Sequence, residues 1–103
     1  MSSSEKLVLR NQDVVRCLLG TPEGHSHMRA LLETADGKQI FLQEATLANI
    51  TRAYVTLKTH PVRKALELVL ERVENPKEGF AHWQVLESSQ EDEEILRRLA
   101  EAM

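Results

Sequence analysis

The clearest pattern in the chain is a pair of apolar stretches that flank a turn. The stretches cover residues 28–34 and 38–43, and Ala35-Asp36-Gly37 lies between them. Asp-Gly between apolar runs is a strong hairpin signal, because both residues accept the positive φ that a tight turn requires. We therefore predict a β-hairpin here. Residues 6–10 indicate a short strand or extended lead-in, and residues 80–87 favour a third strand.

Elsewhere the apolar residues recur at the spacing of an amphipathic helix. This spacing marks four segments: residues 11–19, 46–58, 61–73 and 88–103. Asn11 offers an N-cap for the first helix and Gly20 a stop. Pro61 ends the second helix and suits the first turn of the third. Ser88 followed by Glu91 forms a capping-box pattern at the start of the last helix.

These elements together predict the fold class. Runs of strands followed by runs of helices are typical of α+β domains. We expect a small single α+β domain over residues 1–103, in which the β-hairpin and the third strand pack against three to four helices. Residues 1–5, which include three serines, are expected to be flexible.

Composition narrows the class of protein. Hydrophobic residues make up 42% and charged residues 28%, as in ordinary globular domains, and aromatic residues make up only 4%. The lone Cys17 excludes a disulfide scaffold and favours a reducing compartment, and its apolar neighbours predict a buried structural thiol. No apolar run is long enough to span a bilayer, and the N-terminus lacks the apolar stretch of a signal peptide. We expect a cytoplasmic protein that makes no use of a membrane.

The chain carries no motif typical of a catalytic site. Its four glycines lie far apart, so there is no glycine-rich phosphate loop, and there is no nucleophile elbow. The carboxylates of the C-terminal segment lie on a solvated helix surface in the predicted fold, where pKa values stay ordinary. We therefore expect no enzyme activity, no cofactor and no small-molecule substrate.

One alternative is a histidine-based metal site. His25 and His27 form an H-x-H pair, and His60 and His82 could supply further nitrogen ligands. In an extended segment the two imidazoles of such a pair point to the same side, which suits a tetrahedral ion. The simpler interpretation is that all four histidines are ordinary polar residues, and we prefer it.

A second alternative is nucleic-acid binding by the basic 46–64 region. The segment from Thr59 to Leu66 resembles the opening of the recognition helix in GntR-type winged-helix regulators, which often read Pro-Val-Arg-x-Ala-Leu. The resemblance implies that Arg63 and Lys64 face the major groove, and Arg52 and Lys58 on the preceding helix could contact phosphates. It covers about eight residues, and the family's turn glycine is missing. No family resembles the chain over its full length.

The leading hypothesis is a non-catalytic interaction or regulatory module that self-associates. The predicted helix 61–73 is apolar on more sides than one contact face requires. Such a helix must be enclosed in the core or must meet another chain, and symmetric dimers are the commonest solution. We expect a homodimer or another protein partner, with the interface formed by Val62, Leu66, Val69, Leu70 and Val73.

Overall fold

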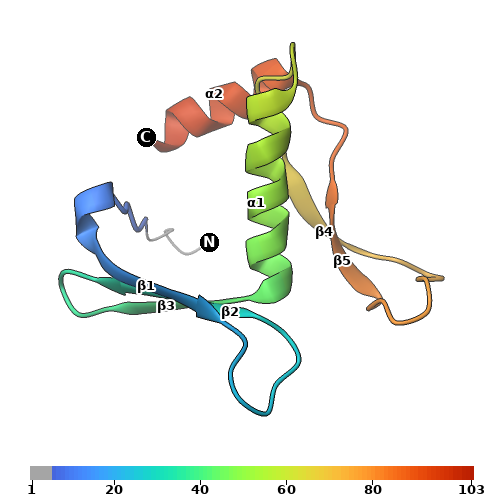
Figure 1. Ribbon diagram of the computed structural model, residues 1–103. Helices are drawn as coiled ribbons and strands as arrows, with labels where there is room; N and C mark the ends of the chain where they lie inside the picture. The colour runs from blue at the N-terminus through green and yellow to red at the C-terminus, as the bar shows by residue number, and fades with distance from the viewer. Residues whose placement is uncertain (1–5) are drawn as a thin grey trace, which may run out of the picture. The chain divides into compact units, whose positions relative to one another are not determined.

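The computed structural model describes residues 6–103, and the chain divides into two compact units, Met1–Ala48 and Asn49–Met103. The secondary structure, drawn in Figure 1, consists of the 3-10 helix η1 (Asn11–Asp13), strands β1 (Val14–Gly20), β2 (Arg29–Thr34) and β3 (Gln39–Gln43), helix α1 (Glu44–Thr59), strands β4 (Leu68–Arg72) and β5 (Trp83–Glu87), and helix α2 (Asp92–Ala102). The flexibility predicted for residues 1–5 lies outside the described residues, and a single domain over residues 1–103 stays a prediction.

The first unit contains a three-stranded antiparallel sheet in the order β1-β2-β3. The middle strand pairs on both sides: Leu32 lies opposite Cys17 of β1 and opposite Ile40 of β3. A register shift between Val14 and Arg16 bends the start of β1. The predicted hairpin over residues 28–43 is therefore confirmed as β2 and β3.

The turn between β2 and β3 is held by Thr34. Its backbone N–H donates to the carbonyl of Lys38 at 2.9 Å, and its hydroxyl oxygen accepts from the Lys38 N–H at 2.9 Å. These bonds satisfy the polar groups of Thr34, which is only 6% exposed. Within this turn only Gly37 takes a positive φ, of 89°, because a three-residue loop needs a left-handed residue at its last position.

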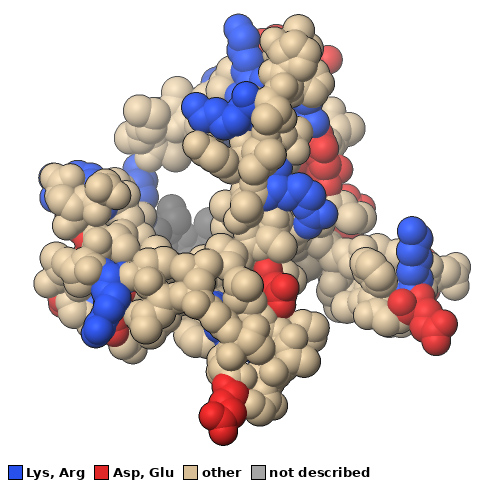
Figure 2. Space-filling model, in the orientation of Figure 1, with Lys and Arg blue, Asp and Glu red and all other residues tan. Residues whose placement is uncertain are grey.

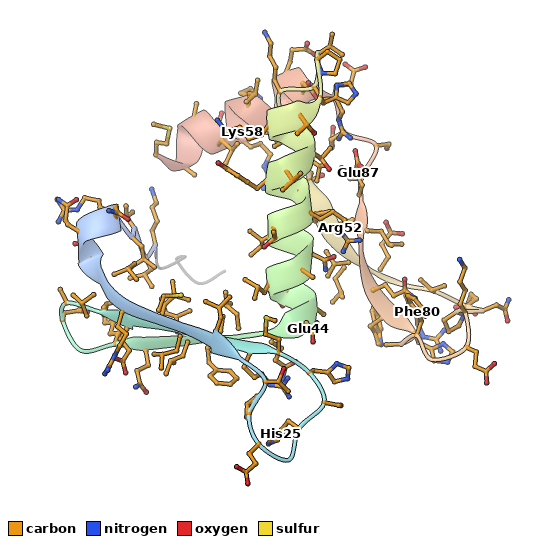
Figure 3. All side chains as sticks on the ribbon, in the orientation of Figure 1. His25, Glu44, Arg52, Lys58, Phe80 and Glu87 are labelled. Atoms are coloured by element: carbon orange, nitrogen blue, oxygen red, sulfur yellow. The ribbon has the colours of Figure 1, made fainter. Side chains whose placement is uncertain are left out.

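The second unit consists of most of α1, an antiparallel β4–β5 hairpin and α2. Leu70 lies opposite Val85, and Leu68 lies opposite Glu87. Between α1 and this hairpin lies a groove of about 230 Å³, whose lining includes Arg52 and Glu87; both side chains are labelled in Figure 3. The hairpin thus lies beside one face of α1.

Residues 60–67 connect α1 to β4 without regular structure. The Nδ1 atom of His60 accepts from the backbone N–H groups of Val62 at 3.2 Å and Arg63 at 3.0 Å. The next N–H, that of Lys64, donates to Asp92 Oδ2 of α2 at 2.8 Å. Side chains therefore take three successive backbone donors, and Ala65 behind them is 3% exposed, the most buried residue of the unit.

The predicted number of helices is wrong. The described residues form two α-helices and five strands in two sheets, in place of three to four helices on one hairpin, although the mixed α and β content agrees with the predicted class. The predicted helix 61–73 fails because its first turn donates to side chains and its Leu-Val-Leu run pairs with β5. The predicted helix 11–19 fails because Cys17, Leu18 and Leu19 pair with β2.

Three other predicted elements are found. Helix α1 ends at Thr59, next to the position that Pro61 indicated. The predicted strand over residues 80–87 is shorter, as β5. The last helix begins at Asp92 with Glu91 as N-cap, so the Ser88 capping box does not form; the Ser88 hydroxyl accepts from the Gln90 N–H instead.

The turn geometry makes a testable prediction about Gly37. We expect Gly37→Ala to lower the free energy of unfolding by about 1 kcal/mol, because an L-residue with a side chain is strained at positive φ. The matched control is Gly20→Ala, at a glycine without positive φ where an added Cβ meets nothing within 4 Å. That control should change stability by less than about 0.5 kcal/mol in urea unfolding. Equal losses in both variants would contradict the assigned turn.

Candidate interaction site

Exposed apolar surface is the most distinctive feature of the described residues. Among residues 6–103 only two hydrophobic residues, Ala30 and Ala65, are buried, and no large side chain is fully buried. Twenty large hydrophobic side chains are exposed by more than a third of their area. Single exposed apolar residues are normal on proteins, but so many beside so small a core indicate surfaces that require a cover.

One face of the sheet in the first unit is apolar across all three strands. Successive residues of a strand point to opposite faces, and paired residues share a face. We define the apolar sheet face by the residues that the register places on one side of the sheet: Cys17, Leu19, Ala30, Leu32, Ile40 and Leu42. Every one of them is uncharged, and Ala30 at the centre is 1% exposed.

The opposite face carries a polar row across all three strands. Glu33 of β2 accepts from Arg16 Nε of β1 at 2.7 Å and from Gln39 Nε2 of β3 at 3.0 Å. The hydrogen bond from Arg16, followed by that from Gln39, holds the pKa of the Glu33 carboxyl below its ordinary value. The same face also has an apolar row, formed by Leu18, Leu31 and Phe41, so it is polar in part only.

One edge of the same sheet is both open and apolar. Among the described strands, β1 pairs only with β2, so its outer backbone groups have no strand partner. We call the outer side of Val14–Gly20 the open edge. Val15 is 63% and Leu19 is 58% exposed there, and Arg16 is the only charged residue of the strand. Proteins usually protect such edges with charges, proline, β-bulges or a covering element, and this edge has Arg16 and the register shift between Val14 and Arg16.

The sequence pattern did not predict the open edge, because residues 11–19 were assigned to a helix, and the position of Cys17 was wrong for the same reason. Val14, Val15, Leu18 and Leu19 have helical spacing, but a short apolar run that begins with two β-branched residues fits a strand equally well. The prediction that Cys17 is a buried thiol is wrong: it is an exposed free cysteine on the edge strand.

The second unit carries a second apolar patch at the free end of its hairpin. Leu70 is 64% exposed and pairs with Val85 of β5. Trp83 lies two positions before Val85 in β5, so its side chain is on the same face of the hairpin as Leu70. Phe80, in the loop between the strands, is labelled at the hairpin end in Figure 3. Aromatic side chains are enriched at the centres of interfaces, so this patch is a candidate contact surface.

The residues predicted as an interface are split by the missing helix. Val62 lies in the connection and is exposed, whereas Leu66 is half-buried and lines the groove against α1. Val69 and Leu70 belong to β4, where they point to opposite faces of the hairpin. Val73 is half-buried, and its N–H donates to the His82 carbonyl. No single helical face presents these five residues, and their role in partner contact stays a prediction.

The four histidines have separate local roles. His25 lies in the loop between β1 and β2 (Figure 3), and His27 Nδ1 is 3.5 Å from Glu44 Oε1. His60 accepts two backbone bonds, and His82 Nδ1 donates to the Val73 carbonyl at 3.2 Å. Within residues 6–103 no three His, Cys, Asp or Glu side chains are grouped so that they could hold a metal ion. The histidine-based metal site therefore stays an untested alternative.

The basic residues of the 46–64 region either contact other side chains or lie apart from one another. Arg63 does not begin a recognition helix; its guanidinium pairs with Glu87 of β5. Arg52 donates to Asn49 at 2.8 Å, and Lys58 lies 6.0 Å from the centre of the Tyr54 ring. Lys64 is exposed. Figure 2 shows basic side chains separated by uncharged surface.

Comparison of the chain with models of protein families, with curated protein sequences and with solved structures finds no significant match. Among the described residues, neither helix has the length and apolar character required to cross a membrane.

The polar row predicts a pH dependence. Because Arg16 lowers the pKa of Glu33, the row stabilises the fold above the ordinary carboxyl pKa of 4.5 and loses that contribution as the pH falls through the lowered value. We expect Arg16→Gln to move the Glu33 pKa, measured by carbon-13 NMR, back toward its ordinary value. Arg29→Gln is the control, since Arg29 donates to the carbonyls of His27 and Met28. An unchanged Glu33 pKa in Arg16→Gln would refute the assignment.

Proposed function

We propose that this chain is a non-catalytic interaction module that functions as a homodimer in the cytoplasm. The observation that carries the proposal is the ratio of exposed to buried apolar side chains: twenty large hydrophobic residues are exposed, and only Ala30 and Ala65 form a buried apolar core among residues 6–103. The proposed contact surfaces are those of the sheets and not a 61–73 helix.

The energetics support a cover from outside each unit. Burial of one Val or Leu side chain contributes about 1.5–3 kcal/mol, and small domains are stable by only about 5–15 kcal/mol. A two-stranded hairpin such as β4–β5 is marginal by itself, and a three-stranded sheet needs its apolar face covered. Without a cover, the apolar sheet face would contribute little to stability.

A second copy is the occupant we favour. Closed two-fold dimers are the commonest oligomers of soluble proteins, and a two-fold interface uses the same patch on both chains. A surface that is apolar across neighbouring strands, such as the apolar sheet face beside the open edge, suits this arrangement because identical apolar patches do not repel each other. Charged patches of one sign would repel, and only Arg16 is charged in β1.

A non-catalytic role agrees with the structural contacts of the carboxylates whose pKa values are lowered. Each carboxylate whose pKa is lowered accepts a hydrogen bond first from a neighbouring side chain: Asp13 from Arg10, Glu33 from Arg16, Asp36 from Thr34 and Glu94 from Arg97. These bonds hold turns, strands and a helix surface. The cytoplasmic location is supported by the free thiol of Cys17.

The oligomeric state tests the proposal. We expect light scattering coupled to size-exclusion chromatography to give twice the mass of one chain at micromolar concentration and above. The dimer should withstand high salt, because burial of apolar surface is not screened by ions. The mass of one chain over the whole concentration range would contradict the proposal.

The nucleic-acid alternative makes the opposite prediction for salt. Binding through Arg52, Lys58, Arg63 and Lys64 would give retention on heparin at low salt that falls steeply as salt is added. We expect no such retention, and we expect Lys58→Glu to leave the elution unchanged. Retention that Lys58→Glu abolishes would favour the nucleic-acid role over ours.

A further inference from the structure

The groove between α1 and the β4–β5 hairpin combines an apolar wall with hydrogen-bond donors that have no protein acceptor. We propose that this groove binds a small aliphatic carboxylate, that is, a ligand with one carboxylate group and an apolar body. The inference goes beyond the proposed homodimer, and all the residues that line the groove belong to the second unit.

Apolar side chains form most of the wall of the groove. They come from α1, from the connection that follows it and from both strands of the hairpin: Ala53, Leu66, Leu68, Val85 and Leu86. The volume is about 230 Å³. Pockets for drug-sized molecules measure about 300–1,000 Å³ and are likewise mostly apolar, with a few polar groups that orient the ligand. This groove therefore suits a smaller ligand with an apolar body.

One face of α1 supplies the polar groups. Asn49, Arg52 and Thr56 recur at a spacing of three and four residues, so they share this face and line the groove together. Arg52 Nη2 donates to Asn49 Oδ1 at 2.8 Å, which leaves the amide NH2 group of Asn49 as a donor. Among residues 6–103 neither this NH2 group nor the Thr56 hydroxyl donates to a protein acceptor, although both residues are half-buried. These donors are available to a ligand oxygen.

The charges of the groove favour an anion. Its two charged lining residues are Arg52 and Glu87, and Glu87 pairs with Arg63. Within the described part of the chain Arg52 has no carboxylate partner, so one positive charge is left uncompensated. Figure 3 labels Arg52 on the side of α1 next to the hairpin. A guanidinium offers parallel N–H donors that match the two oxygens of a carboxylate.

The amount of charge selects a carboxylate over a phosphate. A phosphate group carries a charge of about −1.5 to −2 at neutral pH, whereas one guanidinium balances a single negative charge. The apolar wall would also leave most oxygens of a phosphate without hydrogen bonds, which is costly when they are removed from water. A carboxylate at Arg52 with its apolar body against the leucines satisfies both parts of the groove.

Titration of the protein with sodium octanoate, followed by nitrogen-15 NMR, tests this inference. We expect saturable shifts at millimolar octanoate, centred on the residues of the groove. Arg52→Gln should weaken binding about tenfold or more, because a hydrogen bond to a charged group is lost. Lys58→Gln is the matched control: it removes the same charge from the same helix, but Lys58 lies over the Tyr54 ring and does not line the groove.

Two further comparisons separate the carboxylate from the apolar body. Octanol lacks the carboxylate, and acetate lacks the longer apolar chain, so each should bind about tenfold or more weakly than octanoate. Ala53→Leu adds side-chain volume to the wall of the groove and should abolish octanoate binding while Arg52 is kept. Circular dichroism establishes that each variant is folded.

The results that overturn the inference are distinct from those that overturn the homodimer. No saturable shift with millimolar octanoate, equal affinity in Arg52→Gln and Lys58→Gln, or equal binding of octanol would each contradict a carboxylate site in this groove. Inorganic phosphate that binds through Arg52 as tightly as octanoate would contradict it too, because the apolar wall would then have no role. Light scattering measures the mass and not this groove, so the two proposals fail independently.

Discussion

Backbone hydrogen bonding between antiparallel strands is the interaction on which this structure depends. Within the described residues, β2 pairs on both sides and β4 pairs with β5, while buried apolar side chains are few. Hydrogen bonds alone contribute modestly to net stability, because the unfolded chain makes similar bonds to water. A sheet that holds its strands in register but leaves its apolar face partly exposed therefore requires another surface for its stability.

Different parts of the sheet in the first unit meet this requirement to different degrees. The turn at Thr34 satisfies its polar groups locally, and the polar row of Arg16, Glu33 and Gln39 faces water. The apolar sheet face has no such provision, whereas the β1 edge has Arg16 and the register shift between Val14 and Arg16. In a dimer that covers the apolar sheet face, the polar row would stay in solvent, so both sets of side chains would have the surroundings that they suit.

Local signals explain which parts of the fold could be predicted. The β2–β3 hairpin follows from Asp-Gly, and the end of α1 follows from Pro61, because both depend on the conformational limits of single residues. Residues 61–73 and 11–19 could not be assigned in this way. Their apolar runs fit both the helical and the strand period, so contacts with other parts of the chain decide between helix and strand. His60 and Asp92 accept hydrogen bonds from the backbone N–H groups of residues 62–64. The strands β4 and β1 form because they pair with β5 and β2. The candidate site moved with these elements, from a helix to the surfaces of the sheets.

The dependence of stability on protein concentration tests the central claim most directly. If two copies cover each other's apolar surface, the midpoint of urea unfolding rises as the protein concentration is raised, because association stabilises only the folded chain. A midpoint that stays the same over a wide range of protein concentration would contradict the claim.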